Sequence, residues 1–384
     1  MSKFKRVRIK GFRRLHEVDL ELRPLTVMIG ANGVGKTSIL DVFSLLSASA
    51  GAKLNEKLNE LGGIGSLLTY GRANSLSLSL DMGVPGYEPL VYELNIAPKG
   101  PSYSILSETL SHARAKGRGL PPFYHISSSY DDIRYYEVDE KKLLRPTWEH
   151  NLLETSLSQV PKMFKEPEEL RRTLSSTTFY HVLNVDPRAP VRLPQQMRPA
   201  ELPGKDGEDL VPLLYYMRES NSERFETVED TLHSAFPGFE GLNFPPVAAG
   251  VLAMTWKDKN FAKPMYMNQL SEGMLRFLWL AALLQSPGLT ALTMIDEPEV
   301  SLHPELLSLL ADLLREASTR TDILIATHSD RLVRFLKPDE VVVMDINQEG
   351  LASAVWANAL DLEEWLKEYS LDEIWRKGRI GGRS

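Results

Sequence analysis

One stretch near the start of the chain constrains the fold more than any other feature. Residues 30–37 have the sequence Gly-Ala-Asn-Gly-Val-Gly-Lys-Thr, which fits the spacing G-x-x-x-x-G-K-[ST]. The nearly all-apolar residues 25–29 precede it, as in a buried strand, and an apolar helix is expected over residues 36–46. In this order, the glycines let backbone N–H groups turn inward, and the helix N-terminus attracts anions. The sequence therefore predicts a phosphate-binding loop.

The side chains of this loop have distinct predicted roles. We expect Lys36 to reach the β- and γ-phosphate oxygens of ATP, and the Thr37 hydroxyl to ligate Mg²⁺. A chance glycine-rich turn is the alternative, but such a turn would not require the flanking strand and helix. The other residues expected to contact the nucleotide here are Asn32, Gly33, Val34, Gly35 and Ser38.

A second element of the same site is expected at the end of residues 291–295, which are apolar apart from one threonine. Asp296 follows this run and would lie at the carboxyl end of a core strand, where ligands bind in α/β sheets. We expect Asp296 to hold the Mg²⁺, directly or through water. Glu297, one residue on, would orient or deprotonate the water that attacks the γ-phosphate. The alternative is that the two acids only cap the next helix.

The spacing of these elements predicts the organisation of the chain. Its 384 residues would accommodate two or three ordinary domains. However, Lys36 and Asp296 must meet at one Mg²⁺, so we expect one α/β core that is interrupted by an insertion. Residues 1–110 would form the N-terminal part of the core with a β-rich lobe, residues 111–245 a mostly helical insertion, and residues 246–384 the C-terminal part. Strands and helices alternate in the last part, which favours a parallel sheet.

Charge is distributed unevenly along the chain. Its net charge is -7, yet residues 1–14 contain seven Lys and Arg side chains and no acid. This cluster fits either a solvated edge strand protected by cations or a patch that binds the phosphate of a nucleotide or nucleic acid. The absence of cysteine excludes disulfides, zinc fingers, iron–sulfur clusters and thiol catalysis. No apolar run approaches the ~18 residues of a membrane span, so we expect a cytoplasmic protein without a membrane partner.

Four further segments resemble one family of ATPases. Residues 269–274 (Gln-Leu-Ser-Glu-Gly-Met) resemble the signature loop of ABC-type ATPases. Residues 296–304 resemble the Walker B motif and D-loop of AAA-like ATPases related to RecF, structural-maintenance-of-chromosomes and overcoming-lysogenization-defect proteins. Residues 325–329 are similar to their switch-histidine strand, and residues 7–13 to their first strand. The resemblance implies an α/β P-loop NTPase fold with an ABC-type core, made of a mixed-sheet lobe and a helical lobe.

The resemblance also implies a head-to-tail homodimer with composite nucleotide sites. Ser271 and Gly273 would meet the γ-phosphate held by a second protomer, at a helix N-terminus. His328 would contact the γ-phosphate from the same subunit as Lys36, and Arg13 would contact the nucleotide. The alternatives are a satisfied core histidine for His328 and an exposed member of the basic cluster for Arg13.

The function implied by the resemblance is that of an Mg²⁺-dependent ATPase that dimerises on ATP. It would act as a switch in DNA repair, recombination or phage defence, with DNA or a separate nuclease or effector protein as partner. Only 56 residues follow His328, so no nuclease module is expected. A transporter's nucleotide-binding subunit and a small-molecule kinase are the alternatives. The family's Mg²⁺-binding glutamine between the lobes stays unassigned, because no glutamine lies between Lys36 and Gln159.

Overall fold

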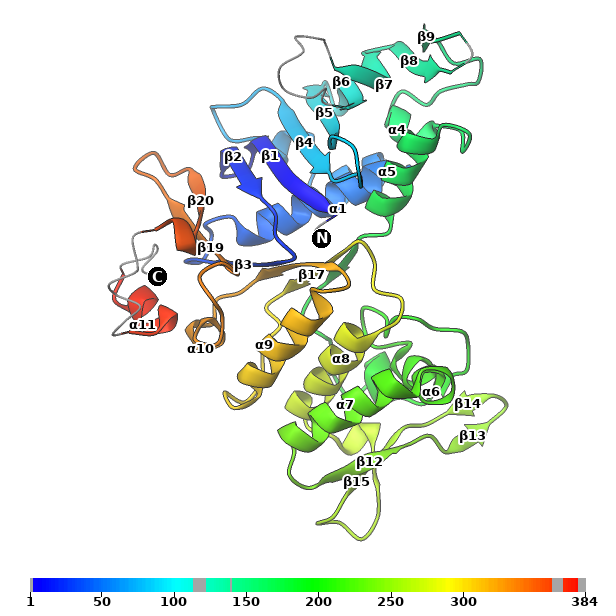
Figure 1. The fold of residues 1–384 in the computed structure, drawn as a ribbon, viewed down its shortest axis with the longest axis vertical. Helices are drawn as coiled ribbons and strands as arrows, with labels where there is room; N and C mark the ends of the chain where they lie inside the picture. The colour runs from blue at the N-terminus through cyan, green and yellow to red at the C-terminus, as the bar shows by residue number, and fades with distance from the viewer. Residues whose placement is uncertain (1–2, 113–121, 139, 361–368, 379–384) are drawn as a thin grey trace.

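The computed structural model describes residues 3–112, 122–138, 140–360 and 369–378. Two large sheets and a helical lobe make up these residues (Figure 1). The first sheet is antiparallel and has the strand order β2-β1-β4-β5-β6-β7-β8-β9. Its strands are β1 Phe4–Phe12, β2 Leu15–Glu21, β4 Leu76–Met82, β5 Leu90–Lys99, β6 Ser102–His112, β7 Phe123–Ser129, β8 Asp132–Glu137 and β9 Lys142–Leu144.

The second sheet carries the phosphate-binding loop and has the order β10-β17-β18-β3-β19-β20. All neighbouring strands in it are parallel except the antiparallel pair β19 and β20. This confirms the expected α/β core. Its strands are β3 Leu25–Ile29, β10 Thr178–Tyr180, β17 Leu292–Asp296, β18 Asp322–Ala326, β19 Val341–Ile346 and β20 Ala352–Trp356.

Central strands of this second sheet are buried on both faces, which explains their nearly continuous apolar sequences. In β3, Val27 and Ile29 join the core formed with the helical lobe, whereas Met28 joins the core formed with the first sheet. Helix α1 lies between the two sheets in the second of these cores, and α8 and α9 cover the opposite face (Figure 1). The sheet edge that ends in functional residues is therefore held from both sides.

Helix α1 begins at the expected residue, Lys36, and continues four residues beyond the expected end. The α-helices are α1 Lys36–Ala50, α2 Leu54–Glu60, α3 Ile64–Leu67, α4 Ser156–Gln159, α5 Lys165–Ser175, α6 Leu210–Ser220, α7 Ser222–Ala235, α8 Glu272–Gln285, α9 Leu306–Ala317, α10 Asp330–Val333 and α11 Leu371–Arg376. The short 3-10 helices are η1 Pro190–Arg192, η2 Met267–Gln269 and η3 Ala357–Ala359.

The helical lobe contains α6 to α9 and two small sheets. One has the order β11-β14-β13 and the other β12-β15-β16. Strand β14 ends before β15 begins, and these two consecutive strands belong to different sheets. The strands of these sheets are β11 Gln195–Gln196, β12 Phe239–Asn243, β13 Pro246–Ala248, β14 Val251–Leu252, β15 Thr255–Asp258 and β16 Met265–Tyr266.

Residues 111–245 differ from the mostly helical insertion expected from the sequence. Helices α5, α6 and α7 are present, but β7, β8 and β9 extend the first sheet, and β10 belongs to the core sheet. The described strands in this stretch have 2 to 7 residues, apart from the end of β6. Such short strands show little periodicity and are stabilised by pairing with distant neighbours, so their sequences alone did not indicate them.

The basic first strand also differs from the edge strand expected as one alternative. It lies inside the sheet, between β2 and β4, and acids on both neighbours pair with its cations. Arg6 lies 2.5 Å from Asp19, and Arg8 lies 2.8 Å from Asp81. A similar pair joins Lys10 to β2. Much of the positive charge expected at this surface is therefore neutralised within the protein.

Candidate active site

Three glycines give the phosphate-binding loop its shape. Gly30, Gly33 and Gly35 have φ angles of 149°, 77° and 111°, which side chains rarely tolerate. A Cβ atom at Gly30 would lie 2.3 Å from the carbonyl oxygen of Met344, so a side chain has no room there. Space is open around Gly33, where only the backbone conformation requires glycine. The loop thus turns sharply from β3 into α1 against strand β19.

Lys36 is buried at the start of α1 and is held by the loop that precedes it. Its Nζ atom donates to the carbonyl oxygens of Gly30 at 2.8 Å and Ala31 at 2.9 Å. The same atom lies 3.1 Å from Nδ1 of His328. Burial lowers the pKa of Lys36 to about 8, although the nearby acids Asp296, Glu297 and Glu299 oppose this shift. The ammonium therefore has polar neighbours on several sides.

Thr37 and Asp296 meet where α1 begins and β17 ends. The Thr37 hydroxyl donates to Oδ2 of Asp296 at 3.3 Å. Burial, and then the charge of Glu297, raise the pKa of the Asp296 carboxyl group. A hydroxyl and a carboxylate are the hard oxygen donors that Mg²⁺ prefers, so these two side chains fit the metal expected with ATP.

His328 connects Lys36 to Glu297. Its Nδ1 faces the Lys36 ammonium, and its Nε2 lies 3.4 Å from Oε1 of Glu297. Since an ammonium donates to Nδ1, the neutral imidazole would carry its proton on Nε2 and present it to the carboxylate. Burial, and then the charge of Lys36, lower the pKa of His328 and favour this neutral form. The histidine expected at the γ-phosphate therefore lies beside the predicted base.

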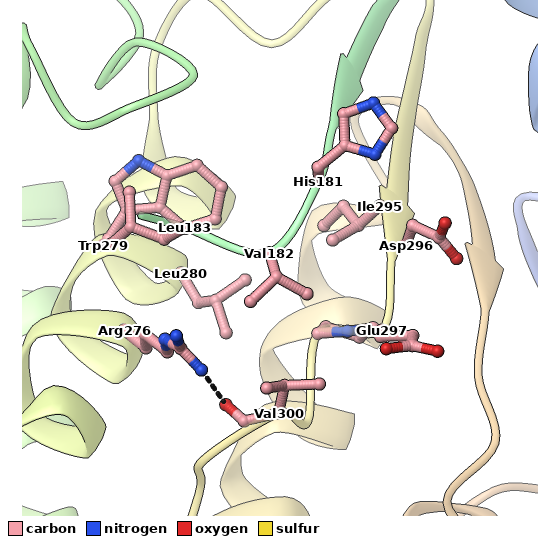
Figure 2. Close-up of a pocket in the computed structure, with 11 residues that line it drawn as sticks. His181, Val182, Leu183, Arg276, Trp279, Leu280, Ile295, Asp296, Glu297 and Val300 are labelled. Carbon is pink, nitrogen blue, oxygen red and sulfur yellow. Dashed lines mark hydrogen bonds between the residues drawn. The ribbon is translucent and has the colours of Figure 1, made fainter. Parts of the chain in front are cut away.

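Glu297 leaves the sheet with an unusual backbone conformation. Its φ is 51°, in the left-handed region, and its N–H donates to the carbonyl of Ala326 at 2.8 Å. This turn breaks the alternation of β17, so Asp296 and Glu297 face the same open end of the sheet (Figure 2). Strain of this kind is common where a side chain must be aimed at a ligand.

Glu299 is a positioning residue for which the sequence suggested no role. Its Oε1 accepts hydrogen bonds from the Thr327 hydroxyl at 2.5 Å and from the His328 N–H at 3.3 Å. Its Oε2 is buried and has no hydrogen-bond partner among the described residues. Burial raises the pKa of this carboxyl group. The last acid of the Asp-Glu-Pro-Glu segment thus fixes the loop that carries His328.

Arg13 lies at the phosphate-binding loop, where its guanidinium pairs with an acid of α1. Its Nη1 is 2.5 Å from Oδ2 of Asp41 and 3.5 Å from the Ser38 hydroxyl, both on α1. A cavity of about 240 Å³ lies over the loop. The residues lining this cavity are Arg13, Arg14, Gly33, Gly35, Lys36, Thr37, Ser38 and His328.

Two predicted loop residues have different surroundings. Asn32 is exposed, whereas the side chain of Val34 is buried in the core below the loop. The Val34 side chain would therefore support the loop, and only its backbone could face a phosphate.

The signature-like segment is not part of this cavity. Ser271 caps α8 by accepting a hydrogen bond from the Met274 N–H at 3.3 Å. Gly273 packs against the loop after β17, where an added Cβ would lie 3.0 Å from the carbonyl oxygen of Ser301. Arg276 strengthens this contact through a 2.7 Å bond to the Ser301 hydroxyl, and Figure 2 shows its second bond, to Val300. Neither Ser271 nor Gly273 lines the cavity over the phosphate-binding loop.

Comparison with protein families agrees with this arrangement. Residues 25–334 match the model of the family described as "AAA domain, putative AbiEii toxin, Type IV TA system". The chain belongs to this family. The match runs from the first strand of the parallel sheet to the end of the His328 segment, so this AAA-domain protein carries every element of the site within the matched residues except Arg13 and Arg14.

Single relatives of this AAA-domain protein agree in fold or in part of the sequence. An OLD nuclease of Thermus scotoductus is 50% identical over 42 residues, which is 11% of this chain and 8% of the nuclease. An Smc head bound to the C-winged helix domain of ScpA has a TM-score of 0.55 at 14% identity, over 92% of this chain and 97% of the head. A Pyrococcus furiosus Smc head bound to the C-terminal domain of ScpA has a TM-score of 0.55 at 13% identity, over 99% and 100% of the two chains. At such low identity these heads share the fold alone.

The described residues have two further properties that bear on the site. None of the helices there combines the length and apolar character that a bilayer crossing needs. The same residues contain no group of three His, Asp or Glu side chains arranged to hold a metal ion.

Proposed function

We propose that this AAA-domain protein binds ATP with Mg²⁺ and hydrolyses the γ-phosphate bond. The observation that carries the proposal is the convergence of Lys36, Thr37, Asp296, Glu297 and His328 at one end of the parallel sheet. These residues come from three separate segments of the chain. They supply a cation for phosphate, a pair of metal ligands and a carboxylate, which are the parts that phosphoryl transfer to water needs.

Each side chain has a defined task in this mechanism. The Lys36 ammonium exchanges its carbonyl partners for β- and γ-phosphate oxygens. Thr37 and Asp296 would hold Mg²⁺, which supplies charge neutralisation to the phosphates. Glu297 orients the attacking water and accepts its proton. His328 presents its Nε2 proton toward Glu297 and the γ-phosphate, and Glu299 fixes the backbone of His328.

We also propose that ATP joins two copies of the chain head to tail. Ser271 and Gly273 lie outside the cavity over their own phosphate-binding loop, on a helix N-terminus that could accept a phosphate from another molecule. A γ-phosphate shared between protomers would stabilise the dimer, and its removal by hydrolysis would weaken it. The protein would in this way act as an ATP-controlled switch.

The pathway we propose for this switch is DNA repair, recombination or phage defence. Support comes from the local identity to an OLD nuclease and from the family description, which names a toxin system. The partner would be DNA or a separate nuclease or effector protein. Because the cations of β1 are paired with acids, DNA contact would use other surfaces as well.

The test of the basic activity is nucleotide binding and phosphate release by Lys36→Ala. This variant should lose measurable ATP binding in calorimetry, because the main phosphate-binding cation is removed. Lys257→Ala is a suitable control, since Lys257 pairs with Glu240 on the surface of the helical lobe. An unchanged ATP affinity in Lys36→Ala would contradict the proposed site.

A further inference from the structure

His181, which has no role in the site described above, follows strand β10. This strand pairs in parallel with β17, and the register aligns Tyr180 with Ile295. The next residue along each chain segment, His181 after β10 and Asp296 at the end of β17, therefore lies at the same level of the sheet edge. Figure 2 shows the imidazole of His181 beside β17, above the carboxylate of Asp296, and the two residues line one pocket.

The positions of the two side chains place the imidazole next to the candidate metal-binding carboxylate. His181 and Asp296 follow residues that are paired on neighbouring parallel strands, and both line the same pocket. The ring is therefore suitably located to bind an ion that Asp296 holds.

His181 is also oriented and available. It packs against Phe179, two residues earlier on the same face of β10, with 4.2 Å between the ring centroids and 47° between the planes. Phe179 is buried and therefore limits how the imidazole can turn. His181 itself is exposed, and within the described ranges no hydrogen bond or ion pair engages its ring nitrogens. Phe179 limits the orientation of this imidazole, and its two ring nitrogens have no hydrogen-bond partner among the described residues. Such a histidine is suited to bind a metal ion.

We propose that His181 is a ligand of the divalent cation held by Thr37 and Asp296. This inference rests on the proposed ATPase function and deepens it. The ion would be bound by a hydroxyl from α1, a carboxylate from β17, an imidazole following β10 and phosphate oxygens of the nucleotide. Hydroxyl and carboxylate alone suit Mg²⁺, whereas imidazole favours transition-metal ions. The site would thus bind Mn²⁺ and similar ions more tightly, relative to Mg²⁺, than the same site without the histidine.

The test uses Mn²⁺ as a spectroscopic probe, together with a non-hydrolysable ATP analogue. Pulsed electron paramagnetic resonance of the wild-type complex should reveal coupling between Mn²⁺ and a directly bound nitrogen. Protein that is expressed with ¹⁵N-labelled histidine should show a changed coupling. This change identifies the coupled nitrogen as one of histidine and not of the nucleotide or the backbone of other residues. His181→Gln should lose the signal, and the ratio of its Mn²⁺ to Mg²⁺ affinity should fall about tenfold.

Matched variants separate His181 from the other nearby imidazole. His328→Gln should retain the nitrogen coupling, because His328 contacts Lys36 and Glu297 on the other side of the site. A wild-type complex that binds Mn²⁺ and nucleotide without histidine coupling would overturn the inference and leave the proposed ATPase intact. Coupling that survives in His181→Gln would have the same meaning. Failure of the wild type to bind nucleotide at all would overturn both, and the labelled wild type gives its answer even if His181→Gln does not fold.

Discussion

Lys36 and Glu297 contact the two ring nitrogens of one imidazole, that of His328. The lysine ammonium lies 3.1 Å from Nδ1 of His328, and Glu297 lies 3.4 Å from Nε2 of the same ring. Glu299 accepts a hydrogen bond from the backbone N–H of this histidine. The phosphate-binding cation and the predicted base are therefore connected at the scale of single residues by one ring.

Nucleotide affinity should depend on pH because of Lys36. Burial holds its pKa at about 8, and phosphate oxygens favour the charged ammonium, so binding raises the pKa and takes up a proton. Affinity should be nearly constant below about pH 7 and about tenfold weaker at pH 9 than at pH 7. Calorimetry in buffers of different ionisation enthalpy measures both the affinity and the proton uptake. Lys36→Arg, which stays charged, should lose the dependence. Equal wild-type affinity at the two pH values would contradict this account.

Replacing Glu297 with Gln should separate binding from hydrolysis. The amide keeps the size of the side chain but cannot accept the proton of water, so phosphate release should fall at least about 100-fold. ATP binding should persist, and light scattering at saturating ATP should detect a trapped dimer. Glu60→Gln is a control on an exposed carboxylate that pairs with Lys57. A monomeric Glu297→Gln protein at saturating ATP would refute the head-to-tail arrangement.

At the scale of elements, the β3–loop–α1 unit depends on its packing against strand β19. A Cβ added at Gly30 would lie only 2.3 Å from the Met344 carbonyl oxygen, whereas one added at Gly33 would have no neighbour within 4 Å. Both residues have positive φ angles. Alanine variants at these two positions therefore separate the loss of stability from a steric clash from the loss due to the backbone conformation alone.

Gly30→Ala and Gly33→Ala should consequently differ in stability. Gly33→Ala should lower the free energy of unfolding by about 1 kcal/mol, the cost of a left-handed side-chain residue. Gly30→Ala should lower it by about 3 kcal/mol, since the loop and β19 must also move apart. Urea denaturation of both variants measures the difference. Equal losses would mean that the clash with Met344 is relieved without cost.

At the scale of the whole molecule, the role proposed for Ser271 depends on a second copy of the chain. It caps α8, and its helix N-terminus packs against the loop around Ser301, away from the cavity over the phosphate-binding loop. The nucleotide contact that we propose for Ser271 would involve a second copy of the chain, and composite sites can be tested by mixing variants.

Ser271→Asp should abolish hydrolysis without unfolding the protein. Asp caps a helix as well as Ser does, but its carboxylate repels a γ-phosphate, so turnover should fall at least about 100-fold. Ser271→Asn is the uncharged control and should retain more activity. An equal mixture of Ser271→Asp and Lys36→Ala should recover about a quarter of the wild-type rate, since half of the dimers are mixed and each has one intact site. No recovery in the mixture would argue against composite sites.

Much of the site could be predicted from the sequence, because its parts are local. The loop at residues 30–37 and the acids at 296 and 297 each follow an apolar run, and the position of a side chain after a buried strand determines the edge of the sheet at which it lies. The structure brings Lys36, Thr37, Asp296, Glu297 and His328 together as this logic requires.

The amino-acid pattern was enough to predict the strand–loop–helix unit, the α/β class and the order of the motifs, since these depend on periodicity and on glycine geometry over a few residues. Contacts in the folded chain were needed to learn that acids on β2 and β4 pair with the cations of β1, that Glu299 holds His328, and that His181 stands beside Asp296. Strand β10 has three residues and no pattern of its own. Its position comes from pairing with a strand more than 100 residues away, and contacts over such separations leave no local signal in the chain.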